Sequence, residues 1–255
     1  MDIPLNMLLI ICPLTFLAGF VDSIAGGGGL ISLPAYMFIG FSPHLAAGTN
    51  KLSSSIGTMF STLRYAKNKQ IHYKSAFIAA GFALLGSFGG AKLALVLSDK
   101  YLRLCMLILL PAAAVFVLAR KSYGEKNTVS DLSGTRLVVL CMLVGLALGA
   151  YDGFFGPGTG TFLILAFTGL MGFDLATASG NTKIVNLSSN IAAVAAFIIG
   201  GSVNYRIGIP AALAGILGHW IGSGLAIRNG ARVIRPVFIG VMVLLFAKIL
   251  WDVFG

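Results

Sequence analysis

Residues 19–30 read GFVDSIAGGGGL, a glycine cluster that separates a long apolar segment, residues 4–24, from a short one, residues 30–41. At 1.5 Å per residue the short segment makes a helix of only about 18 Å, whereas the hydrocarbon core of a bilayer is about 30 Å thick. The sequence therefore predicts a half-helix or a re-entrant segment that begins at the glycines.

The surrounding composition is that of a membrane protein. Of the 255 residues, 57% are hydrophobic and only 10% are charged. Soluble domains carry about 25% charged residues, so the composition excludes a soluble globular enzyme, a disordered chain and a nucleic-acid-binding module. It predicts an all-α polytopic membrane protein that lies in a lipid bilayer. The net charge of +10 is expected to reflect Lys and Arg in cytoplasmic loops.

The chain also contains an internal repeat. From Ser42 onward an offset of 132 residues pairs Lys51 with Lys183 and Arg103 with Arg235, and before Ser42 an offset of 130 residues pairs Asp22 with Asp152. The second half has its own short apolar segment, residues 160–173, at the position that matches residues 30–41. We expect a first transmembrane repeat at residues 1–119, a cytoplasmic linker at 120–135 and a second transmembrane repeat at 136–255.

The loop charges predict that the two repeats are inverted. Lys and Arg are concentrated at residues 64–74, in the linker and at residues 228–235. These three regions share one side of the membrane if each repeat makes an odd number of crossings, which the positive-inside rule favours. We therefore predict two inverted repeats whose glycine-initiated half-helices meet near the membrane centre, a pattern that marks transport sites.

Both glycine clusters are candidates for binding an anion. Glycines let several backbone N–H groups converge, and a helix N-terminus adds a positive partial charge. The alternative is a tight turn that needs small residues for close packing. The candidate binding residues in the two clusters are Gly26, Gly27, Gly28, Gly29, Gly156, Gly158 and Thr159.

Lys51 and Lys183 are the charges that packing explains least well. Each lies about 13 Å of helix beyond a predicted cap, Ser42 or Asp174, and so close to mid-membrane. A buried ammonium needs a counter-charge, which Asp22 or Asp152 can supply. In a structural interpretation these aspartates pair with the lysines or cap the glycine turns. In a functional one the lysines attract a small anion and an aspartate gains and loses a proton.

Polar side chains accompany both lysines at helical spacing. A polar stripe on a membrane helix faces a cavity or the protein interior, although it can also serve helix–helix hydrogen bonding. The first stripe is Asn50, Ser54 and Thr58, and the second is Thr182, Asn186 and Asn190. The candidate substrate-binding residues on these helices are Asn50, Lys51, Ser54, Asn181, Lys183 and Asn186.

The sequence gives little support for catalysis, for a bound cofactor or for a metal site. His219 and Ser223 are four residues apart, but no third group completes a triad and no Gly-x-Ser-x-Gly motif is present. We therefore interpret His219 as a core polar contact. No metal-ligand spacing is present and no cofactor is expected. The glycine pairs Gly86/Gly90 and Gly218/Gly222 indicate close helix packing, within the chain or in a dimer.

Residues 19–33, 48–51 and 151–160 resemble the TauE/SafE sulfite exporter family, and the resemblance covers nearly the whole chain. It implies a bacterial inner-membrane permease for sulfite, an organosulfonate or a related sulfur anion, with export driven by the proton gradient. Together with the residues, it favours alternating access around the glycine clusters. The alternatives are a passive anion channel and, less favoured, an intramembrane enzyme. Direction of transport and oligomeric state stay open.

Overall fold

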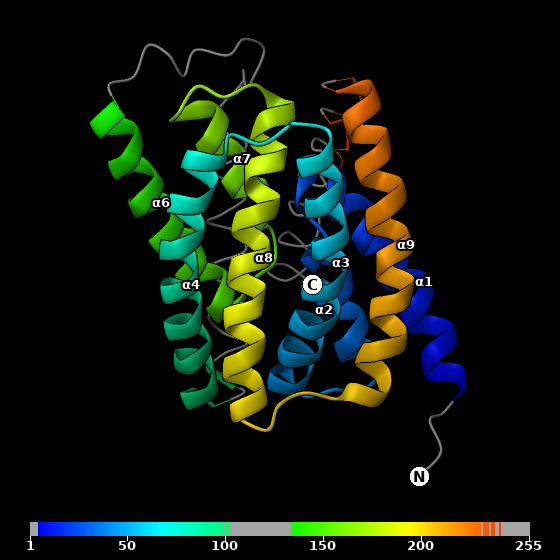
Figure 1. Ribbon diagram of the computed structural model, residues 1–255. Coiled ribbons are helices and arrows are strands. Elements are labelled where there is room, and N and C mark those ends of the chain that lie inside the picture. The colour runs from blue at the N-terminus through cyan, green and yellow to red at the C-terminus, as the bar shows by residue number, and fades with distance from the viewer. Residues whose placement is uncertain are drawn as a thin grey trace.

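The computed structural model describes residues 5–98, 100–101, 134–230, 232–234, 236–237 and 240. In this part of the chain all regular secondary structure is helical (Figure 1). Residues 102–133, which include most of the predicted linker, and most residues beyond 230 lie outside it. The helices are α1 (Leu5–Ala25), α2 (Gly29–Phe38), α3 (Pro43–Lys67), α4 (Tyr73–Val96), α6 (Gly134–Phe154), α7 (Thr159–Gly169), α8 (Leu175–Ile199) and α9 (Tyr205–Asn229).

Helix length and composition confirm an all-α polytopic membrane protein. In the described residues, 5 helices are long and apolar enough to cross a membrane, namely α1, α4, α6, α8 and α9. Helix α3 is as long, with 25 residues, but more polar. Helices α2 and α7 have only 10 and 11 residues. Their lengths of about 15 Å and about 17 Å are too short to cross the hydrocarbon core, as the sequence predicts.

The central helices begin where the local chemistry predicts. At α3, Pro43 is the first helical residue and the Ser42 hydroxyl accepts a hydrogen bond from the Leu45 N–H. At α8, the Asp174 carboxylate accepts hydrogen bonds from the Ala176 and Thr177 N–H groups, both at 3.0 Å. Such caps satisfy N–H groups that have no partner inside the helix. The predicted cap role of Asp174 is confirmed.

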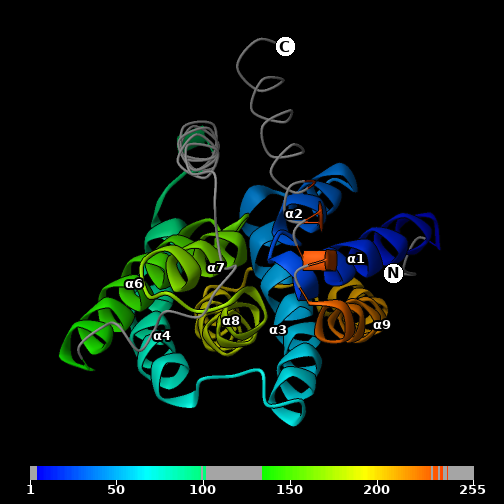
Figure 2. The ribbon, with the colours of Figure 1, turned by 90° about the horizontal axis from the view of Figure 1, so that it is seen from above.

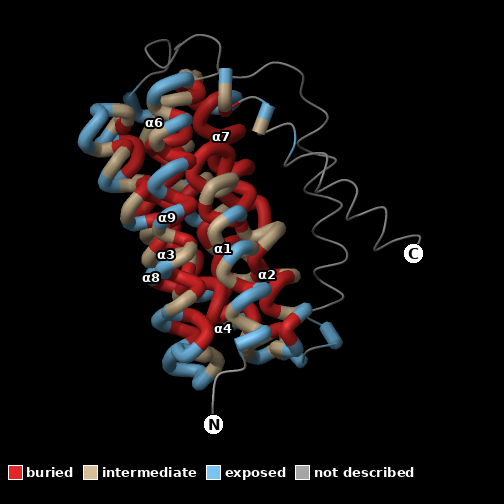
Figure 3. The backbone as a smooth tube through the Cα atoms, turned by 90° about the vertical axis from the view of Figure 1, so that its right-hand side faces the viewer, coloured by how far each residue is buried: buried red, intermediate tan, exposed pale blue. Residues whose placement is uncertain are grey.

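The helices form two groups that exchange one helix between the sequence halves. Helices α1, α2 and α3 pack with α9, whereas α6, α7 and α8 pack with α4 (Figure 2). We call these the α1–α3/α9 group and the α6–α8/α4 group. They meet along α3 and α8, which each have many buried residues. Figure 3 shows that buried residues are concentrated in the interior of the molecule. The last described helix of each half thus packs mainly against the other half.

Contacts between the halves are reciprocal. The His72 N–H donates to the Asn181 side chain at 2.8 Å, and the equivalent Asn204 N–H donates to the Thr49 hydroxyl at 3.0 Å. Equivalent helices run in opposite directions in Figure 1: α1, α3 and α9 upward, and α6, α8 and α4 downward. Both observations support a two-fold relation between the halves. Which end of the molecule lies on the cytoplasmic side of the membrane stays a prediction.

The glycine pairs are used for packing inside the chain. Gly86 and Gly90 of α4 lie against the backbone of α6, and Gly218 and Gly222 of α9 lie against the backbone of α1. A side chain at any of the four would collide with that backbone. Close helix approach through small residues is the usual way in which membrane helices associate. Of the two interpretations of these pairs, packing within the chain is the one seen.

Candidate functional site

The two half-helices begin at one point in the middle of the molecule. Gly26, with φ +78°, lies against the backbone of Gly160 and Thr161. The Thr161 N–H donates to the Gly26 carbonyl at 3.2 Å, and the Thr161 hydroxyl donates to the Ala25 carbonyl at 3.0 Å. On the other side, Gly29 lies against Pro157. The predicted meeting of the glycine-initiated half-helices is thus present, and close packing explains part of the glycine content.

Lys51 of α3 is held by residues of the other helix group. Its ammonium lies 2.7 Å from Asp152 Oδ2 at the end of α6 and donates to Asn190 Oδ1 at 3.0 Å. Asp152 also accepts a hydrogen bond from the Ser189 hydroxyl. Both members of the ion pair are buried, with side-chain exposures of 5% and 6%. The low dielectric strengthens their attraction but makes removal of either charge costly.

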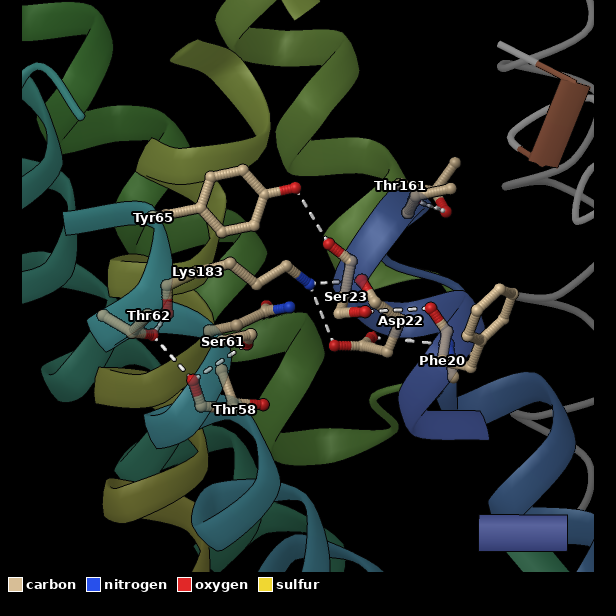
Figure 4. Close-up of polar contacts among 12 residues, drawn as sticks. Phe20, Asp22, Ser23, Thr58, Ser61, Thr62, Tyr65, Thr161 and Lys183 are labelled. Carbon is tan, nitrogen blue, oxygen red and sulfur yellow. Dashed lines mark hydrogen bonds and ion pairs between the residues drawn. The ribbon is translucent and has the colours of Figure 1, made fainter. Parts of the chain in front are cut away.

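Lys183 of α8 makes the reciprocal pair. Its ammonium lies 2.9 Å from Asp22 Oδ2 at the end of α1 and also donates to the Asp22 carbonyl (Figure 4). Asp22 Oδ1 accepts the Gly28 N–H at 3.3 Å. Asp22 therefore pairs with a lysine and caps the glycine turn at once, the two structural roles that the sequence suggests. Beside it, the Tyr65 hydroxyl donates to the Ser23 carbonyl at 3.0 Å.

A cavity lies between the two helix groups, where the half-helices begin. Its wall is formed by glycines and by hydroxyl, amide and charged side chains of both helix groups. Helix α9 contributes Ala211, Gly215 and His219. The sequence-predicted residues that line the cavity are Asp22, Gly26, Gly28, Gly29, Asn50, Lys51, Ser54, Asp152, Gly156, Thr159 and Asn186. Thr58 and Asn190 of the predicted polar stripes line it as well.

The remaining predicted residues lie elsewhere. Lys183 is fully buried behind Asp22, away from the cavity wall. Asn181 accepts the backbone N–H of His72 at the start of α4. Gly158 precedes α7 in a left-handed conformation, with φ 82°, which explains a glycine there. Gly27 belongs to the turn before α2, where its carbonyl accepts the Leu30 N–H.

The sequence analysis did not assign Thr15, Ser32 or Ser53 to the site, and it interpreted His219 as a core polar contact, whereas all four line the cavity. A signal for His219 was available, because Ala211, Gly215 and His219 follow the i, i+4, i+8 spacing that places residues on one helix face. Two buried polar atoms of wall residues have no hydrogen-bond partner in the described part of the chain: Asn186 Oδ1 and His219 Nδ1. In the same part, no group of three or more His, Cys, Asp or Glu side chains is placed to hold a metal ion.

Comparison with known proteins identifies the family. The sequence profile described as "Sulfite exporter TauE/SafE" matches residues 11–249. The chain belongs to the TauE/SafE family. It is a multi-pass membrane protein of this transporter family, and the predicted resemblance is confirmed.

TauE/SafE relatives match over almost their full length. The chain is 36% identical to "Probable membrane transporter protein ORF9" of Sinorhizobium sp, over 98% of this chain and 95% of the relative. It is 35% identical to "Probable membrane transporter protein YfcA" of Escherichia coli K12, with the same coverage. A "Probable membrane transporter protein" of Haemophilus influenzae Rd is 32% identical, over 99% of this chain and 98% of the relative. No solved structure matches.

Proposed function

We propose that this TauE/SafE protein is a permease for a small sulfur-containing oxyanion or organosulfonate, such as sulfite, and that the central cavity is its binding site. One observation carries the proposal: Lys51 and the starts of both half-helices converge on the same buried cavity. A helix N-terminus and an ammonium group both favour an anion. The family description names sulfite, and sulfite offers several acceptor oxygens to such donors.

The cavity wall supplies donors of three kinds. Gly29 and Gly160 lie in the first turns of the half-helices, where backbone N–H groups have no partner inside the helix. Amide groups belong to Asn50 and Asn186, and the ammonium to Lys51. Hydrogen bonds from charged or oriented donors to an oxyanion are shorter and stronger than those between neutral groups. In this proposal the anion takes a place beside Lys51 and shares its ammonium with Asp152.

The arrangement also suggests how access would alternate. Lys51 and Asp22 belong to the α1–α3/α9 group, and Asp152 and Lys183 to the α6–α8/α4 group, so each ion pair bridges the two groups. We propose that the moving bodies are these two helix groups, each with one exchanged helix, and not the two sequence repeats. Rocking around a fixed central site is the usual scheme for repeat-built transporters.

Proton coupling is proposed through the charge balance at the site. Asp22 and Asp152 neutralise the two lysines when the cavity is empty. An anion that enters adds an uncompensated negative charge, which is costly in a buried site. A proton taken up with the anion restores neutrality. In this proposal the aspartates contribute to proton coupling because they make the empty site electrically neutral.

Flux into proteoliposomes tests the proposal. We expect saturable uptake of sulfite, sulfoacetate or methanesulfonate that depends on a pH gradient. Lys51→Ala is expected to abolish it, whereas Lys92→Ala, which changes an exposed lysine of α4 outside the cavity, is expected to leave it intact. Unitary currents would instead indicate a passive channel. Unaltered flux in Lys51→Ala would remove Lys51 from the site.

A further inference from the structure

His219 differs from the other titratable side chains of the cavity wall. Within the described residues, these side chains are Asp22, Lys51, Asp152 and His219. The first three are held in ion pairs, with Lys183 completing the second pair. His219 takes part in no ion pair in the described part of the chain, and its Nδ1 is buried there without a hydrogen-bond partner. His219 as a residue is only 3% exposed.

The fold makes a specific place for this ring. It lies against Gly19 of α1 and Gly57 of α3, and a Cβ added to Gly19 would come within 2.8 Å of His219 Cδ2. The equivalent residue of the other half is Ser87, whose hydroxyl donates to the Ser189 carbonyl at 2.6 Å. In that half, the polar side chain at this position thus has a hydrogen-bond partner within the protein. The other half presents an imidazole to the cavity.

Charge balance says what the imidazole can do. With both ion pairs formed, the empty site has no net charge, so a bound anion needs one compensating positive charge. Histidine is the side chain whose ordinary titration lies nearest neutrality. The charged groups around it are Asp22 on α1, Lys183 on α8 and Lys51 on α3. Farther along α3, Arg64 donates to the carbonyl of Trp220, the next residue of α9.

We propose that His219 takes up one proton when the anion binds, and that the proton and the anion therefore cross the membrane together in the same direction. The proton is accepted by the ring-nitrogen lone pair and is released when the anion leaves, so no covalent bond between heavy atoms changes. The proposal rests on the anion-permease function above. Asp22 and the anion both stabilise the imidazolium that forms, since each carries a negative charge.

Calorimetry on the purified full chain measures this proton directly. Methanesulfonate, a fully ionised monoanion near neutral pH, is the probe for the proton count, and sulfoacetate, a dianion at that pH, is a second probe of binding. Titration in buffers with different ionisation enthalpies gives the number of protons bound per anion. We expect uptake of about one proton in the unaltered protein. In His219→Gln we expect no uptake and an affinity about tenfold weaker near neutral pH, because a charge-assisted contact is lost.

A matched variant controls for the chemical change. His44→Gln replaces a histidine whose ring contacts the Ala94 carbonyl outside the cavity, and it is expected to bind protons and anions as the unaltered protein does. Anion binding without proton uptake, or uptake retained in His219→Gln, would overturn the role of His219 and leave the anion site standing. If neither probe binds and Lys51→Ala changes nothing, the anion site itself fails, and this proposal with it.

Discussion

Two buried lysines are each held by an aspartate of the opposite helix group. Lys51 reaches Asp152 at 2.7 Å, and Lys183 reaches Asp22 at 2.9 Å. Removing one partner of a buried pair leaves an uncompensated charge and costs about 3–5 kcal/mol, whereas replacing both by neutral side chains of similar size is often close to neutral. This asymmetry separates the contribution of a pair to stability from its role in anion binding.

The double variant Lys51→Met/Asp152→Asn uses that asymmetry. Lys51→Met alone is expected to lower stability by about 3–5 kcal/mol, seen as a lower melting temperature in detergent. The double variant should regain most of that loss and still fail to bind or transport the anion, because the ammonium is gone. Lys92→Met should stay within about 0.5 kcal/mol of the unaltered protein. Normal transport by the double variant would show that Lys51 only stabilises the fold.

Some contacts of single residues could be predicted from the sequence, and others could not. An unpaired lysine in a membrane helix demands a counter-charge, so its pairing with Asp22 or Asp152 could be anticipated. Which aspartate each lysine takes could not, because that depends on how the two halves pack. Asn181 has the residue type of a binding group but lies at a helix–loop contact with His72. His219 was interpreted as a core polar contact because the sequence offers no triad partner for it. Its neighbours Gly19 and Gly57 could not be identified, since they are far from it in the sequence.

The short helices α2 and α7 carry the site on their N-terminal ends. Length alone predicted them, since neither can cross the hydrocarbon core. The caps of the following helices, Ser42 and Asp174, were equally predictable, because capping depends on residues within one turn. The sequence predicted that the two half-helices meet, but not the direct contact between Gly26 and Gly160. That contact is close because the two glycine turns pack directly against each other.

Gly26→Ala tests that contact. The added methyl group would overlap the backbone of Gly160, and φ at Gly26 is +78°, where a non-glycine residue costs about 1–2 kcal/mol. We expect a clearly lower melting temperature and loss of anion binding. Gly89→Ala is the matched control, because the space around a Cβ there is empty and the residue lies in α4. A Gly26→Ala protein as stable and active as Gly89→Ala would contradict the close contact of the half-helices.

On the scale of the whole molecule, the exchange of α4 and α9 ties the two halves together. The sequence repeat and the loop charges predicted two related halves, and the reciprocal contacts at Thr49 and Asn181 support this. The exchange itself was not foreseen, since periodicity within a helix does not say which helix of the other half it meets. The proposed rocking of two helix groups therefore rests on how the helices pack and not on the repeat alone.

Cysteine labelling tests the predicted inversion. The end of α3 and the end of α9 lie at the same end of the molecule (Figure 1). In a background without Cys12, Cys105 and Cys141, Lys67→Cys and Arg228→Cys should react with an impermeant thiol reagent from the cytoplasmic side only. Arg206→Cys, at the start of α9, should react from the opposite side. Labelling of Arg228→Cys from the periplasmic side would contradict the inverted arrangement.

The central claim is that a small oxyanion binds where Lys51 and the starts of α2 and α7 meet. Anomalous diffraction at the selenium edge, from crystals grown with selenite as an analogue of sulfite, locates such an anion directly. We predict a selenium peak within hydrogen-bond distance of Lys51 Nζ, and its loss in Lys51→Met/Asp152→Asn. An ordered protein without a peak in this cavity, or an equal peak in the double variant, would contradict the claim.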